Sequence, residues 1–189
     1  MVDLIEFQKI NPNDPNVPFK KDSFEIFKER FNEYFPSFPD DVIKEWPYRH
    51  FDDFCNRYWH LDFQCFLFKK MFFDNTIIAS LKTKLSDTEL KNYGNNYLNR
   101  EELKLQNTWL FNYMSDHLTW PQPIIVLETN TCPLEKQAKL HKPYHLLEGH
   151  MRLAIMQAKI RSEEHICPEH EVWCVEMKAG GCNKGNNND

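Results

Sequence analysis

A single glycine separates a strand-like run from a helix-like run in the stretch YHLLEGHMRLAIMQAKI, residues 144 to 160. The run before Gly149 is short and apolar. The run after it places Leu153, Met156 and Ile160 on one face of a helix. The chain has only 5 glycines in 189 residues, so a glycine at this junction marks a backbone turn that needs one. The pattern predicts a strand that turns sharply into a helix packed on a sheet.

Such a turn has chemical consequences for the start of the helix. The first backbone N–H groups are unpaired there, at the end with partial positive charge, which favours phosphate. Arg152 adds a planar fork suited to phosphate oxygens, although the helix dipole disfavours a cation in the first turn. We therefore expect Arg152→Ala to abolish anion binding and to leave the fold nearly intact. The alternative is an ordinary strand-to-helix turn with a surface arginine.

Three further runs predict strands. LIEFQKI alternates apolar and polar residues at Leu4, Glu6 and Gln8. IIVLET, from Ile124, is a continuous apolar run typical of a strand covered on both faces. HEVWCVEM, after the predicted helix, is the third run that predicts a strand. A separate helix is predicted after Asp22, where phenylalanines recur at helical spacing.

The middle of the chain, about residues 40–118, shows helix signals almost exclusively. SDTE at residues 86–89 has the form of a capping box, and LDFQCFLFKKMFF fits either a helix or a strand. The prediction is an α+β fold: one domain over residues 1–178, with a mixed sheet, helices and a large all-helical insertion. The tail, residues 179–189, lacks a periodic apolar pattern and is predicted to be flexible.

Charge and composition narrow the classes of partner. The formal net charge is −5, from 23 basic and 28 acidic residues, so DNA is a disfavoured partner. The net charge does not exclude a local basic patch. No apolar run approaches the roughly 20 residues of a membrane span, and the N-terminus lacks signal-peptide regions. We expect a cytoplasmic protein with no membrane partner, whose 6 cysteines are free thiols.

PIIVLE, YHLLEGHMRLAIMQA and the closing VWCVEM together resemble the ParB/sulfiredoxin-like superfamily, whose signature is a strand followed by Gly-x-x-Arg at a helix start. LIEFQKINPNDPNVPF resembles the first strand and Asn-Pro loop of that family. The resemblance covers roughly residues 3–36 and 121–178 and implies a nucleotide-binding domain. The ligand-binding residues that it implies are Gly149, His150, Met151, Arg152, Asn11 and Asn13.

The resemblance also implies chemistry beside the glycine. The expected ligand is a nucleoside triphosphate, ATP or CTP, bound with Mg²⁺. Glu148 would act through the metal, and His150 would bind phosphate or move a proton, which makes these two the candidate catalytic residues. Hydrolysis or phosphoryl transfer is the expected reaction. The alternative interpretation is that the Glu148 carboxylate only interacts favourably with the positive end of the helix.

Departures from the family pattern exclude some of its activities. Sulfiredoxins have a reactive cysteine after the glycine, where this chain has His150, so sulfinic-acid reduction is not expected. EGHMR is most similar to the Asp-Gly-His-His-Arg form of small-molecule kinases and of plasmid or phage proteins of the family. Two alternatives stay open. One is a non-catalytic interaction module, such as an inhibitor or immunity factor, whose helical insertion docks a partner protein. The other is a ParB-like nuclease.

Zinc is not an expected cofactor. The stretch HICPEHEVWC brings four residues of zinc-ligand type close together in sequence: His165, Cys167, His170 and Cys174. Their spacing fits no standard zinc pattern, and Cys174 falls within a predicted strand.

Overall fold

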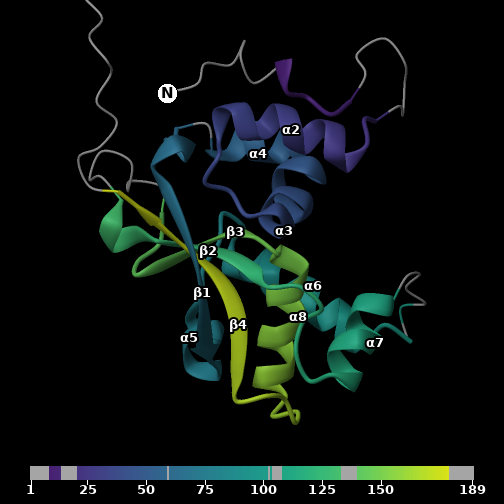
Figure 1. The fold of residues 1–189 in the computed structure, drawn as a ribbon. Coiled ribbons are helices and arrows are strands. Elements are labelled where there is room, and N and C mark those ends of the chain that lie inside the picture. The colour runs from purple at the N-terminus through teal and green to yellow at the C-terminus, as the bar shows by residue number, and fades with distance from the viewer. Residues whose placement is uncertain are drawn as a thin grey trace, which may run out of the picture. The chain divides into compact units, whose positions relative to one another are not determined.

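The computed structural model describes residues 9–13, 21–58, 60–101, 103, 108–132 and 140–178. Within them the chain is a mixed α+β protein built on a four-stranded sheet (Figure 1). The predicted strand over residues 4 to 8 and the predicted tail, residues 179–189, lie outside the described residues.

The elements follow one another along the chain with these bounds. They are α2 (Phe24–Tyr34), α3 (Asp40–Ile43), a π-helical turn (Lys44–Tyr48), α4 (Phe51–Tyr58), a 3-10 turn (Phe63–Cys65), β1 (Phe66–Asp74), α5 (Asn75–Ser80), α6 (Asp87–Leu98), α7 (Trp109–Asp116), β2 (Ile124–Glu128), a second 3-10 turn (Thr129–Thr131), β3 (Tyr144–Glu148), α8 (His150–Arg161) and β4 (Glu169–Met177).

The chain divides into two compact units. The first unit comprises Met1–Phe68, Thr131–Lys136 and Glu176–Asp189, and the second comprises Lys69–Asn130 and Gln137–Val175. These boundaries do not coincide with the predicted limits of an insertion at about residues 40 and 118. No helix among the described residues is both long enough and apolar enough to span a membrane.

The first unit has an aromatic core. Helix α2 begins after Ser23, whose Oγ accepts the backbone N–H of Ile26, and it buries Phe27 and Phe31 as the helical spacing predicted. The Phe31 ring lies 5.9 Å from the ring of Phe54 on α4. Phe54, a phenylalanine of the middle segment, therefore serves as packing in this unit, where aromatic rings bury large areas in close contact.

The sheet has the strand order β1-β4-β2-β3. Strand β2 pairs with β4 in parallel and with β3 in antiparallel orientation, so the sheet is mixed. The strands predicted from IIVLET, from the run YHLLE before Gly149 and from HEVWCVEM are confirmed as β2, β3 and β4. Strand β2 is buried from Ile124 to Leu127, as expected for a strand covered on both faces.

The prediction of an all-helical segment over residues 40–118 is wrong at β1. This strand lies inside that segment and adds to the sheet beside β4. Its Phe73 is buried and contacts Tyr144 with ring centroids 4.7 Å apart. The apolar run LDFQCFLFKKMFF fitted a helix or a strand, and pairing with β4 selects the strand.

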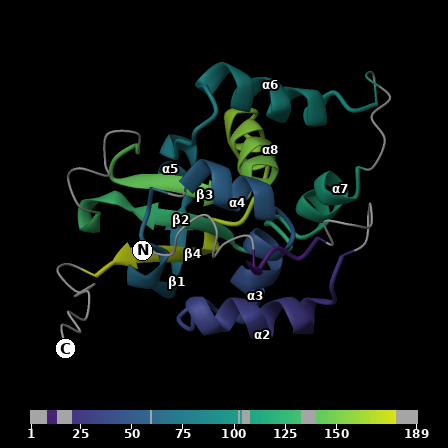
Figure 2. The same cartoon turned by 90° about the horizontal axis from the view of Figure 1, so that it is seen from above.

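Helix α8 packs against one face of the sheet and beside α6 (Figures 1 and 2). Gly94 of α6 makes the approach of the two helices close: a Cβ at this position would lie 2.3 Å from the carbonyl oxygen of Ala154 and 2.9 Å from the Cβ of Ala158. The small residues at this contact therefore set the distance between the helices.

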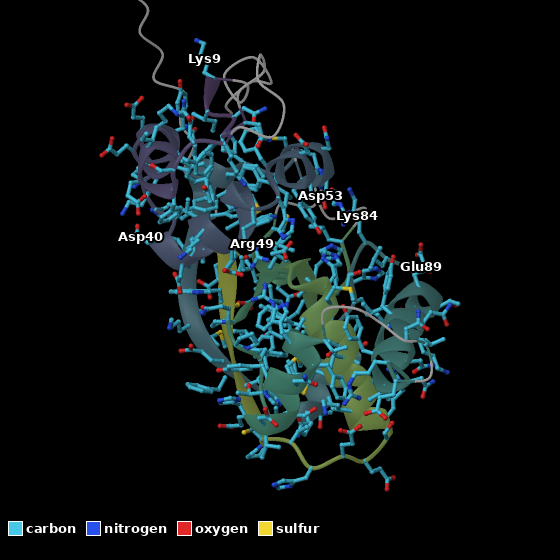
Figure 3. All side chains as sticks on the ribbon, turned by 90° about the vertical axis from the view of Figure 1, so that its right-hand side faces the viewer. Lys9, Asp40, Arg49, Asp53, Lys84 and Glu89 are labelled. Atoms are coloured by element: carbon cyan, nitrogen blue, oxygen red, sulfur yellow. The ribbon has the colours of Figure 1, made fainter. Side chains whose placement is uncertain are left out.

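The capping box predicted at the start of α6 is confirmed. Ser86 Oγ accepts the backbone N–H of Glu89 at 3.2 Å, and Glu89 Oε2 accepts the backbone N–H of Ser86 at 2.9 Å. Glu89 lies on the solvent-facing side of the helix (Figure 3). Two unpaired donors of the helix end are satisfied by this exchange.

We expect Gly94→Ala to lower the free energy of unfolding by about 1–3 kcal/mol, because the added methyl group overpacks the contact with α8. Chemical denaturation of both proteins measures the difference. Asn92→Ala, at an exposed position of the same helix, is the matched control and should change stability by less than about 0.5 kcal/mol. Equal stabilities for wild type and Gly94→Ala would contradict the close packing.

Candidate functional site

The turn between β3 and α8 requires a glycine for two reasons. Gly149 has φ 105° and ψ 28°, in the left-handed region that residues with a side chain rarely adopt. A Cβ at this position would also lie 2.6 Å from Cγ2 of Ile124 on β2. Packing and backbone conformation thus explain the glycine in structural terms, independent of any ligand.

The start of α8 lacks the side-chain cap found at α2 and α6, and the start of α7 likewise has neither a side-chain cap nor an acidic residue in its first turn. Helices α2 and α6 begin with a serine whose hydroxyl accepts a backbone N–H, and both carry an acidic residue in the first turn. Helix α8 begins with Gly149, which has no side chain to accept a hydrogen bond, and its first turn contains no acidic residue. The 12-residue helix therefore keeps its positive end without a carboxylate in the first turn.

Arg152 lies in this first turn but is not a surface residue. Only 7% of it is exposed, and its Nη1 donates to the carbonyl oxygens of Gln122 at 2.9 Å and Pro123 at 3.3 Å. Its Nη2 lies 3.9 Å from Glu148 Oε1. The expectation that Arg152→Ala leaves the fold nearly intact is therefore corrected, because the guanidinium holds two backbone carbonyls of the segment before β2.

The guanidinium still keeps its charge at the turn. A Cβ built on Gly149 would lie 3.3 Å from Arg152 Nε, so the side chain reaches back over the glycine. Glu148, the last residue of β3, has a side chain that is 16% exposed and faces this cation. His150 and Met151, the first two residues of the helix, are half-buried. These five consecutive residues place one carboxylate, one imidazole and one guanidinium around the N-terminal turn.

Residues Gln122 and Pro123 are the part of the site that sequence reasoning missed. They belong to the WPQP stretch, and their carbonyl oxygens complete the environment of Arg152. Trp120 anchors the same stretch, since its Nε1 donates to the carbonyl oxygen of Glu171 at 2.8 Å. The only signal in the sequence is the pair of prolines, which favours an extended backbone whose carbonyls have no helical partner.

Asn11 and Asn13 belong to the first unit and are described with it. Asn13 donates its backbone N–H to Asn11 Oδ1 at 2.9 Å, which is a local turn. Arg30 of α2 donates to the Asn11 carbonyl oxygen at 3.4 Å and also pairs with Asp22. The predicted Asn-Pro loop is thus tied to α2 at its start, and residues 14–20 lie outside the described part.

The four residues of zinc-ligand type do not converge. No group of three or more His, Cys, Asp or Glu residues suited to a metal occurs among the residues that the structure describes. His170 instead bonds through Nδ1 to Thr119 Oγ1 at 2.9 Å and through Nε2 to Asn75 Oδ1 at 3.1 Å. Asn75 Nδ2 donates to the Cys167 carbonyl oxygen at 3.1 Å, which fixes its Oδ1 as the acceptor for His170.

Comparison of the chain with family models, with curated proteins and with solved structures gave no match. The ParB/sulfiredoxin-like resemblance therefore rests on the residues quoted from the sequence and stays a prediction. What the structure adds is the backbone conformation of the Gly-x-x-Arg turn and the contacts of its arginine.

We expect Arg152→Ala to lower the free energy of unfolding by about 1–3 kcal/mol, because the carbonyls of Gln122 and Pro123 lose a charged donor and a buried side chain is removed. Urea denaturation measures the difference. Arg161→Ala, at the exposed end of the same helix, is the control and should change stability by about 0.5 kcal/mol or less. An Arg152→Ala protein as stable as the wild type would show that these carbonyl contacts contribute nothing.

His170 should make the stability of the protein depend on pH. Burial lowers the pKa of His170, an effect that outweighs a backbone hydrogen bond at Cys167 that raises it. The folded state therefore favours the neutral imidazole. The stabilisation that the neutral His170 gives the folded state is fully present above the pKa of histidine in the unfolded state, about 6.5. It is lost as the pH falls through and below that value.

The measurement is the free energy of unfolding of wild type and His170→Gln from about pH 7.5 to about pH 5.5. The advantage of the wild type should shrink as the pH falls. His165→Gln, at an exposed position, should keep the pH dependence of the wild type. A His170→Gln protein with an unchanged pH dependence would contradict the assignment.

Proposed function

We propose that the turn between β3 and α8 binds the phosphate groups of a nucleoside triphosphate, ATP or CTP. We further propose that the chain is a member of the ParB/sulfiredoxin-like superfamily. The observation that supports the proposal is the start of α8, where the first turn has no acidic residue and the Arg152 side chain reaches back over Gly149. Backbone N–H groups at such a helix end favour anions.

The contacts of Arg152 change which groups of the proposed site would bind the phosphates. Its Nη1 is engaged by the carbonyls of Gln122 and Pro123, so the phosphates would be received chiefly by backbone N–H groups of residues 150–152 and by the imidazole of His150. Arg152 would contribute its charge and hold the neighbouring segment in place. This is compatible with a cation placed against the helix dipole, since Glu148 and the carbonyls offset that cost.

Glu148 is the candidate Mg²⁺ ligand. Mg²⁺ in nucleotide sites is held by one or two carboxylates together with the phosphates, so one carboxylate beside the turn fits such an ion. When bound, the metal would neutralise charge that develops on the phosphates. The role of the chain would be to fix the phosphates at the helix end and to place His150 where it can take or give a proton. Hydrolysis or phosphoryl transfer is the proposed reaction.

A cytoplasmic location is part of the proposal. The cysteines in the described part of the chain are free thiols: Cys55, Cys65, Cys132, Cys167 and Cys174. Free buried thiols suit a reducing compartment, where disulfides are rare. The proposed location therefore rests on the free cysteines of the described residues.

ATP or CTP with Mg²⁺ should raise the melting temperature of the wild type, because a ligand that binds only the folded state stabilises it. His150→Ala should lose most of this shift, since the imidazole contacts the phosphates in the proposal. Glu148→Gln should keep a smaller shift that no longer depends on Mg²⁺. Differential scanning fluorimetry measures all three proteins.

His165→Ala is the matched control, because it removes an exposed imidazole at a distance in sequence from the turn. It should retain the full shift. The nucleotide should be present at about 100 times a micromolar dissociation constant, so that a binding protein would be saturated. If the melting temperature of the wild type then stays unchanged with ATP and with CTP, nucleotide binding is contradicted. A shift that His150→Ala retains in full would place the phosphates elsewhere.

A further inference from the structure

Strand β1 ends the sheet on one side, next to β4. Its second half, Lys69–Asp74, belongs to the second unit, and it exposes Phe72 to 63%, the largest exposed fraction among the large hydrophobic residues described. An edge strand presents unpaired backbone groups that can pair with another strand. Pairing of this edge with another strand would remove part of the exposed phenylalanine ring from water.

Side chains alternate between the two faces of the sheet along this half of β1. Met71 and Phe73 lie on the side of the core that contains α8. Lys70 lies on the other side, where its Nζ is 3.2 Å from Glu171 Oε2 and 5.2 Å from the centre of the Trp173 ring. By the two-residue period of a strand, Lys70, Phe72 and Asp74 share this second face, and Asp74 Oδ1 also accepts the backbone N–H of Ile77 at 2.8 Å as the N-cap of α5.

An antiparallel pair of identical strands permits only certain registers, because residues directly opposite each other must lie on the same face. A twofold axis at Lys70 would place two lysines opposite each other, which is unfavourable. An axis at Met71 would place Lys70 opposite Phe72, with no charge partner. An axis at Phe72 places the two exposed rings opposite each other and each Lys70 opposite the Asp74 of the other copy.

We infer that the outer edge of β1 is a self-association surface, at which a second copy of this chain pairs through Lys70–Asp74 in antiparallel orientation with Phe72 on the twofold axis. The charge complementarity of Lys70 and Asp74 selects this register, and the aromatic pair buries the exposed ring. Such a contact is isologous, the commonest arrangement of soluble homo-oligomers. The two sheets would join into one.

The test is sedimentation equilibrium of the full chain over a range of concentrations. The wild type should form a dimer as its concentration rises. Phe72→Asp and Phe72→Lys should each raise the dissociation constant at least about tenfold, because like charges meet on the axis. Phe72 is exposed in the single chain, and circular dichroism checks that each variant folds.

Mixing the two variants distinguishes the proposed register from a general effect of charge. In an equimolar mixture the introduced aspartate lies opposite the introduced lysine, so a heterodimer should form where neither variant dimerises alone. Lys70→Asp should also be monomeric, since it places a carboxylate opposite Asp74. Tyr93→Asp, at an exposed aromatic position of α6, is the control and should dimerise like the wild type.

Two results would overturn the inference. One is a wild type that stays monomeric at the highest concentration tested, which would leave the edge free for some other strand. The other is a dimer that persists in Phe72→Asp, or a mixture of the two variants that shows no gain over either alone.

Discussion

The burial of helix α8 is the constraint on which the rest of the second unit depends. All residues from Arg152 to Lys159 are buried, including three polar or charged side chains that each have partners elsewhere. Gln157 Nε2 donates to carbonyl oxygens at the end of α5, that of Leu81 at 3.0 Å among them, and Lys159 Nζ bonds Ser115 Oγ at 2.9 Å. Burying these polar groups without their partners would cost free energy, so the hydrogen bonds fix the position of α8. The position of α8 in turn fixes the turn at its start.

Arg152 links that packing to the proposed function. The same guanidinium that secures the carbonyls of Gln122 and Pro123 keeps a positive charge over Gly149. Stability and anion binding are therefore not separable at this residue, which is why His150 is the better probe of the ligand. A preorganised charge of this kind costs no rearrangement when a ligand arrives.

The sequence predicted the elements whose signals are local. Strands β2, β3 and β4, helix α8 and the capping box at Ser86 all follow from runs of a few residues. Strand β1 could not be assigned because its apolar run fits two structures and only pairing with β4 decides between them. The partners of Arg152 lie 29 and 30 residues earlier in the chain, a contact that no local pattern encodes. Gly149 was identified from its place between a strand and a helix. That a Cβ at this position would clash with Ile124 could be seen only in the structure.

The central claim is that the N-terminal turn of α8 receives phosphate, and backbone amide NMR tests it most directly. Titration of the ¹⁵N-labelled protein with ATP or CTP and Mg²⁺ should shift the amides of residues 149–152 most, because N–H groups at this turn would donate hydrogen bonds to the phosphate oxygens. Inorganic triphosphate should shift the same amides. Saturable shifts confined to other amides, with those of residues 149–152 unchanged, would contradict the account.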